Sequence, residues 1–183
     1  MNKLFIVVIL AIISFIGYGV YSQIQSESKK KEKRIPCQKE TVTFEKITNI
    51  DLIEKSVDLL KTGNYIVKSR IEQSKYMKSK ILNYISIKEA NLYLKNSIEK
   101  YSTNTKYSEE KLLIDYYIWE NDKEDKGKKS DKAKLYAGYL VFEFKLKNQL
   151  VYKIQTDYMK MDTSDIPNRM NCIIESFITL KRK

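Results

Sequence analysis

The sequence predicts one α+β domain in which N-terminal helices and a C-terminal helix pack on a three- to four-stranded antiparallel meander sheet. Between residues 50 and 101, apolar side chains recur every three to four positions, as in helices that bury one face. Between residues 112 and 158, apolar and polar side chains alternate, as in strands with one covered face. Because the chain has only 5 Gly and 2 Pro, we also expect long regular elements.

Residues 1–22 have the pattern of an export signal. Lys3 precedes an uncharged apolar run, and small residues follow that run. The signal is either cleaved or kept, in which case residues 4–21 anchor the chain in the inner membrane; this length is at the lower limit for a bilayer span. The basic residues that follow favour a third possibility, a domain held on the cytoplasmic side.

Residues 23–36 are predicted to be a flexible tether, because they carry too little apolar surface to fold. Its basic residues are Lys29, Lys30, Lys31, Lys33 and Arg34. They serve either as a solvated spacer or as a contact with an anionic membrane or envelope surface. Residues 37–183 would then form the single extracytoplasmic domain.

Cys37 and Cys172 are the only cysteines, and in an exported chain we expect them to form a disulfide bond. Cys37 directly follows the tether. Cys172 is predicted to lie on the last helix, away from the centre of its apolar stripe, where it can bind an overlying segment. The alternative is two unrelated free thiols. Catalytic redox use is not expected, because the chain has no Cys-x-x-Cys.

The first elements of the domain are predicted in order as a strand and two helices. Residues 41–44 are expected to form the short strand, and residues 50–62 a helix that ends at Gly63. A second helix is expected over residues 64–84, although residues 65–67 could form a strand instead. A capping box, Ser86-Ile87-Lys88-Glu89, then begins the helix with the clearest periodicity.

Three strands and a final helix are predicted after this. Residues 112–119, 138–146 and 150–158 alternate apolar with polar side chains, and Asn148-Gln149 is the expected turn of a hairpin. The charged segment between residues 120 and 134 is expected to be a solvated hairpin tip. Pro167 suits the first turn of the last helix.

Helices followed by a curved meander resemble the layout of NTF2-like and cystatin-like folds, which include the periplasmic domains of some bitopic secretion-system proteins. The resemblance covers about residues 51–160 and rests on the order of the elements. The final helix departs from it.

One face of the predicted sheet is a candidate binding face. Tyr117, Trp119 and Tyr139 alternate with the apolar positions of their strands, as do Asp115 and Glu143. If the strands pair in a suitable register, all five residues share one surface. Aromatic residues favour protein binding, whereas paired carboxylates beside aromatics can hydrolyse sugars. The third possibility is an ordinary solvated face with cross-strand ion pairs.

The charge, the absence of histidine and the absence of known motifs exclude several classes of function. The net charge is +11, but only four of the basic residues are arginines, so nucleic acid is not an expected partner. Histidine is absent, and no phosphate loop, metal-ligand spacing or nucleophile elbow occurs, so we expect neither cofactor nor metal. We therefore expect a non-enzymatic, periplasmic or secreted bacterial envelope protein that binds another, acidic protein as an assembly component or adaptor. The alternatives are an exported inhibitor or immunity protein and a secreted carboxylate-dependent hydrolase.

Overall fold

The computed structural model describes residues 33–103, 106–128 and 130–180. The chain divides into two units, Met1–Arg34 and Ile35–Lys183, and the described helices and strands all belong to the second. The predicted signal or anchor, residues 1–22, lies outside the described residues, as do the tether residues Lys29, Lys30 and Lys31.

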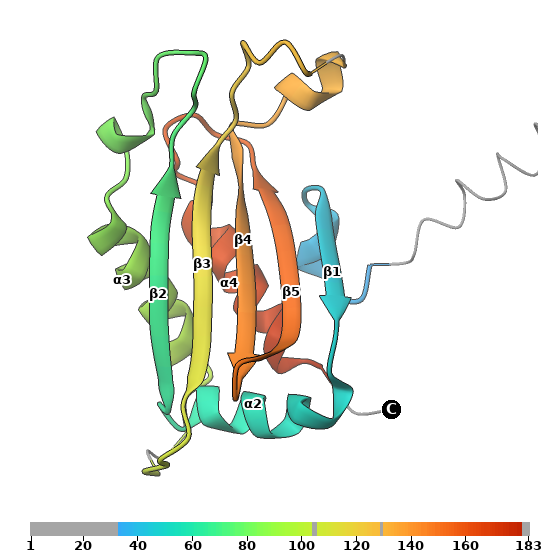
Figure 1. Cartoon of the computed structure of the whole chain (residues 1–183), viewed down its shortest axis with the longest axis vertical. Helices are drawn as coiled ribbons and strands as arrows, with labels where there is room; N and C mark the ends of the chain where they lie inside the picture. Colours follow the sequence, from blue (N-terminus) through green and yellow to red (C-terminus); the bar gives the residue numbers. More distant parts are fainter. Residues whose placement is uncertain (1–32, 104–105, 129, 181–183) are drawn as a thin grey trace, which may run out of the picture. The chain divides into compact units, whose positions relative to one another are not determined.

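Five strands form one open sheet in the order β1-β5-β4-β3-β2 (Figure 1). They are β1 (Thr43–Ile47), β2 (Tyr65–Glu72), β3 (Leu112–Glu120), β4 (Gly138–Leu146) and β5 (Gln149–Tyr158). β3, β4 and β5 form an antiparallel meander; β1 adds antiparallel to β5, and β2 adds parallel to β3. The α+β class is confirmed, but the sheet has five strands and one parallel pairing.

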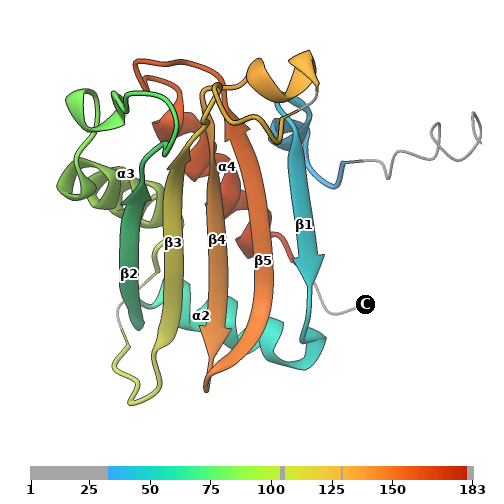
Figure 2. The ribbon, with the colours of Figure 1, turned by 45° about the horizontal axis from the view of Figure 1, so that its top comes forward.

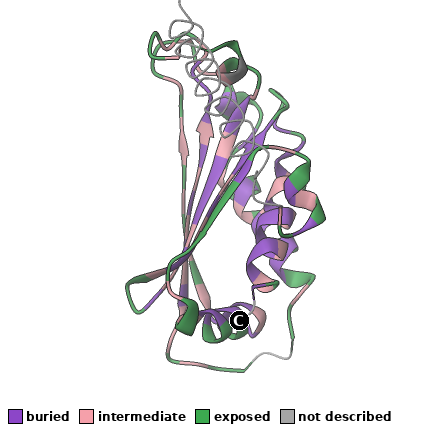
Figure 3. Cartoon of the chain, turned by 90° about the vertical axis from the view of Figure 1, so that its right-hand side faces the viewer, coloured by how far each residue is buried: buried purple, intermediate pink, exposed green. Residues whose placement is uncertain are grey.

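Three helices lie on one face of this sheet (Figure 2). They are α2 (Ile53–Lys61), α3 (Ile87–Glu99) and α4 (Ile166–Ile178). Their apolar sides and the inward side chains of the strands form the core, and buried residues concentrate between the two layers (Figure 3). At its centre the rings of Phe144 and Phe177 stack 3.9 Å apart. The expected block of helices before the sheet is not confirmed, because β1 and β2 alternate with α2 and α3.

The helix predicted over residues 64–84 is wrong, because residues 65–72 form β2 and the following residues contain only the short 3-10 turn η3 (Ile81–Asn83). The spacing of Val67 and Ile71 is the reason for the wrong prediction. They are four residues apart, a spacing that puts two side chains on one face of a helix and also on one face of a strand. β2 joins the sheet parallel to β3 because α3 provides the crossover between them.

The predictions for helix ends and for the hairpin turn agree more closely with the structure. Ser86 Oγ accepts a hydrogen bond from the Glu89 N–H at 3.2 Å, and Glu89 Oε2 accepts one from the Ser86 N–H at 2.8 Å, so the capping box is confirmed. Gly63 follows α2 with a φ of 78°. The turn between β4 and β5 is Lys147-Asn148, one residue earlier than expected, and both residues have positive φ values as a tight hairpin turn requires.

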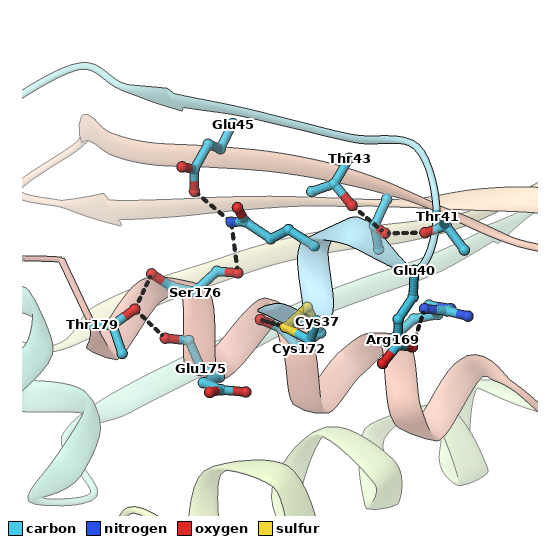
Figure 4. The surroundings of a disulfide bond; sticks show 12 residues. Cys37, Glu40, Thr41, Thr43, Glu45, Arg169, Cys172, Glu175, Ser176 and Thr179 are labelled. Atoms are coloured by element: carbon cyan, nitrogen blue, oxygen red, sulfur yellow. Dashed lines mark hydrogen bonds and ion pairs between the residues drawn. A yellow bond between two sulfur atoms is a disulfide. The ribbon is translucent and has the colours of Figure 1, made fainter. Parts of the chain in front are cut away.

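The Cys37–Cys172 disulfide is present and joins the short 3-10 turn η1 (Pro36–Lys39) to α4 (Figure 4). The side chain of Gln38 is buried beside it and donates to Glu45 Oε2 at 2.9 Å and to Ser176 Oγ at 3.0 Å. Arg169 pairs with Glu40 at 2.8 Å at the other end of this turn. The first turn of the unit is therefore held to the last helix by one covalent bond and several polar contacts.

Candidate functional site

The face of the sheet opposite the helices, the open face, is not covered by any helix of the described residues (Figure 3). Successive side chains of a strand point to opposite faces, so every second residue of β1 to β5 belongs to it. On β3, the inward residues are buried and the outward residues are half-buried without exception. This face is the candidate site.

All five residues of the predicted binding face lie on the open face. Asp115 is the direct cross-strand neighbour of Glu143, and Trp119 is the direct neighbour of Tyr139. Tyr117 lies between these two rows, two residues from each on β3. The antiparallel pairing of β3 with β4 supplies the register that the sequence could not.

Aromatic rings form a continuous cluster at one end of the open face, here called the aromatic cluster. It consists of Tyr117, Trp119, Tyr136 and Tyr139. The Trp119 and Tyr139 rings stack with centroids 4.5 Å apart, and Tyr117 meets Tyr139 edge-on at 6.4 Å. Burial raises the pKa of Tyr139 to about 12, so this phenol remains a neutral hydrogen-bonding group at physiological pH.

Two cations lie over these rings. The Arg70 guanidinium is 4.5 Å from the Tyr117 ring centroid, and Lys128 Nζ is 4.6 Å from that of Trp119. Lys128 also donates to the Asp122 carbonyl oxygen at 2.7 Å and to Asn121 Oδ1. Burial lowers the pKa of this ammonium group, while the nearby Asp125 and Asp122 oppose the change. The rings therefore present a polarised surface rather than a purely apolar one.

The loop after β3 is anchored at its base, whereas most of the described residues of its tip are exposed, as the sequence predicts. Asn121 is fully buried and donates from Nδ2 to the carbonyl oxygens of Ala133 and Tyr136, both at 2.9 Å. These bonds fix the loop to the segment that precedes β4. As a result, Lys128 is held above Trp119.

Glu120 and Asp122 anchor the neighbouring loop, residues 73–80, and sequence reasoning missed this role. Glu120 accepts from the backbone N–H groups of Lys80 at 2.9 Å, Ile81 at 3.1 Å and Ser74 at 3.1 Å. Burial acts to raise the pKa of Glu120, but hydrogen bonds from Ser79, Lys80 and Ser74 outweigh it and leave the pKa lowered. The available signal was an acidic residue at position 120, which continues the inward, even-numbered series of the alternating strand.

The paired carboxylates Asp115 and Glu143 are neutralised by lysines. Lys145 Nζ lies 2.6 Å from Glu143 and 3.3 Å from Asp115, and Lys153 Nζ lies 2.7 Å from Glu143. Hydrogen bonds from Lys145 and Lys153 lower the pKa of Glu143. A general acid at neutral pH needs a raised pKa, so this arrangement resembles a structural ion-pair row more than a glycosidase site.

Asp157 differs from the other carboxylates of the open face. It lies opposite Tyr139 on β5, it is only 6% exposed, and no described residue donates a hydrogen bond to its side chain. Burial therefore raises its pKa to about 6. Its charge also contributes to the raised pKa values of Tyr136 and Tyr139, after the larger effect of burial.

A shallow groove of about 380 Å³ lies at the other end of the open face. Its apolar floor is formed by Ile66 and Leu113 from β2 and β3, and Leu146 of β4, which is buried in the core, borders it. Polar residues line its rim: Glu110, Lys111, Lys145, Lys147 and Asn148. The carboxylates Asp115 and Glu143 lie between this groove and the aromatic cluster, and Lys145 belongs both to their ion pairs and to the groove rim.

Comparison with protein-family models, with curated proteins and with solved structures finds no match for this chain. Among the residues that the structure describes, no helix is long and apolar enough to cross a membrane. Within the same residues, no three His, Cys, Asp or Glu side chains converge as a metal site would require.

Proposed function

We propose that this chain is a non-catalytic bacterial envelope protein that binds another protein through the open face of its sheet. The observation that carries the proposal is the stacked Trp119–Tyr139 pair, half-exposed on a face without a covering helix among the described residues. Trp, Tyr and Arg are the residues that most often dominate the energy of protein interfaces, and here they are adjacent. Rings already held by stacking and by cations lose little conformational freedom when a partner binds.

The charges around this face favour an acidic partner. The strands of this face carry five basic residues: Lys46, Lys68, Arg70, Lys145 and Lys153. They carry four acidic ones: Glu72, Asp115, Glu143 and Asp157. Complementary charge raises the rate of association and sets the orientation of the partner.

The Cys37–Cys172 disulfide supports a place outside the cytosol, because structural disulfides persist in oxidising compartments. A periplasmic or secreted location, with or without an inner-membrane anchor at residues 4–21, remains part of the proposal. Intact mass of the native protein tests it, since the mass reports both cleavage of the signal and the loss of two hydrogens on oxidation.

Site-directed photo-crosslinking in the native envelope tests the binding face. A crosslinking side chain at Gln155, on the open face beside Val141, should trap the partner. The same side chain at Leu92, an exposed residue of α3 on the helical side, is the control and should not. Trp119→Ala should reduce the adduct at position 155 at least about tenfold, as for an interface hot spot. Equal adducts at both positions would refute the proposal.

The same adduct separates the possible roles. A trapped structural envelope protein identifies an assembly component or adaptor. A trapped hydrolase or toxin that loses its activity in the complex identifies an inhibitor or immunity protein.

A further inference from the structure

The strand β2 forms one edge of the sheet, and its outer side is unpaired within the described residues (Figure 1). The Asn64 carbonyl accepts from the Leu112 N–H at 2.9 Å, which sets the phase of the parallel ladder. Backbone groups of even-numbered residues therefore face β3, whereas those of Tyr65, Val67, Ser69 and Ile71 face outward. Eight residues of strand thus offer a free edge to another chain.

Positive charge follows this edge on the open face. Lys68 and Arg70 are both exposed, and no carboxylate of the described residues forms an ion pair with Lys68. Arg70 is partly neutralised by Glu72 at 2.9 Å and Asp115 at 3.4 Å. Cationic residues on an edge strand deter pairing with strands that are not complementary.

A second copy of this chain is less complementary than an acidic strand. If two β2 edges paired antiparallel about Ser69, Lys68 of each copy would lie opposite Arg70 of the other. If the strands moved by one pairing step, either the two Lys68 residues or the two Arg70 residues would lie opposite each other, and only the second of these registers also sets Lys68 opposite Glu72. Like charges directly opposite on one face destabilise a strand pair. An acidic strand would instead face these cations favourably.

The groove gives such a strand an apolar anchor point. Ile66 is 57% exposed and joins the edge to the groove floor at Leu113. Lys111 stands on the groove rim, and its Nζ contacts the neutral Asn64 Oδ1 at 2.8 Å. An apolar side chain two positions from an acidic one can therefore occupy the groove while the acidic one meets Lys68.

We propose that β2 accepts an extended acidic segment of a partner protein as a sixth strand, with one apolar side chain of that segment in the groove. Strand addition gives affinity through main-chain hydrogen bonds, and specificity through alternate side chains. This inference deepens the proposed function by naming the form of the partner, and it rests on that function.

Selection from a library of random linear peptides displayed on phage tests the chemistry, with the full-length, oxidised chain as target. Recovered peptides should contain acidic residues alternating with apolar ones. Lys68→Glu should weaken the best peptide at least about tenfold, because it replaces attraction by repulsion. Lys88→Glu makes the same change on α3, on the helical side of the sheet, and should alter binding less than about twofold. Recovery of no peptide, of peptides without acidic residues, or equal effects of the two variants would overturn the proposal.

Amide hydrogen exchange tests the geometry. In the free protein, the outward amides of Tyr65, Val67, Ser69 and Ile71 should exchange quickly, and the even-numbered amides of β2 slowly. Saturation with the selected peptide should slow the four outward amides at least about tenfold. If binding leaves them unchanged but is lost in Trp119→Ala, the peptide occupies the aromatic cluster. That result overturns strand addition and leaves the proposed function intact.

Discussion

The buried carboxyl of Asp157 provides a quantitative test of the structure. Its pKa is raised from 3.8 to about 6 because burial disfavours the charged form. At 1.36 kcal/mol for each pKa unit, this rise corresponds to about 3 kcal/mol of unfolding free energy. Well below pH 3.8 the carboxyl is protonated in both states and no free energy is lost. Between pH 3.8 and about 6 the unfolded chain ionises first, so stability falls as the pH rises.

Asp157→Asn removes this titration while keeping the shape of the side chain. We take the free energy of unfolding of the variant minus that of the parent. This difference should be about 2–3 kcal/mol larger at about pH 7 than at about pH 4. This double difference cancels the cost of burying the new amide, since that cost is the same at both pH values. Urea denaturation at the two pH values measures it, and a carbon-detected NMR titration should place the Asp157 midpoint near 6.

Asp162→Asn is the matched control, because its carboxyl is perturbed in the other direction. The exposed Asp162 accepts a hydrogen bond from the Ser164 N–H at 3.1 Å, and this bond lowers its pKa. Its double difference should therefore have the opposite sign. If Asp157→Asn shows no double difference, or one of the Asp162 sign, the side chain is solvated or paired. The reasoning about the open face around Tyr139 would then be wrong.

Three further predictions concern the elements that hold the open face in place. Gly138→Ala should lower the free energy of unfolding by about 3 kcal/mol or more in urea denaturation, because a Cβ there would overlap the Trp119 carbonyl oxygen; an unchanged midpoint would contradict this packing. Glu120→Ala should lower the free energy of unfolding by about 3 kcal/mol and speed amide exchange over residues 73–81, because several backbone donors lose their acceptor. Faster exchange only in other segments would contradict the role of Glu120. The double variant Cys37→Ser, Cys172→Ser should have a free energy of unfolding lower by about 2–5 kcal/mol. Dithiothreitol should lower the urea midpoint of the parent and leave that of the double variant unchanged. Equal midpoints of the oxidised parent and the variant would show that the bond adds no stability.

Most of the local structure was available from the sequence. The alternation along β3, β4 and β5 predicted three strands and the face that each buries, because side chains of a strand alternate regardless of its neighbours. Ser86 with Glu89 predicted the start of α3, since the capping box uses only local hydrogen bonds. The oxidised pair Cys37 and Cys172 followed from cysteine number and an inferred compartment.

Only the tertiary structure decided where β2 belongs and what surrounds each carboxylate. Val67 and Ile71 fit a helix and a strand equally, and it is the parallel ladder with β3 that makes them strand residues. The sequence shows acidic residues at positions 115, 120, 143 and 157 without distinguishing them. In the fold, Glu120 binds backbone N–H groups, Asp115 and Glu143 meet lysines, and Asp157 meets no donor among the described residues. Hydrogen bonds and burial depend on residues distant in the chain, whereas periodicity depends on adjacent ones, and this is why the elements could be predicted but the chemistry of the face could not.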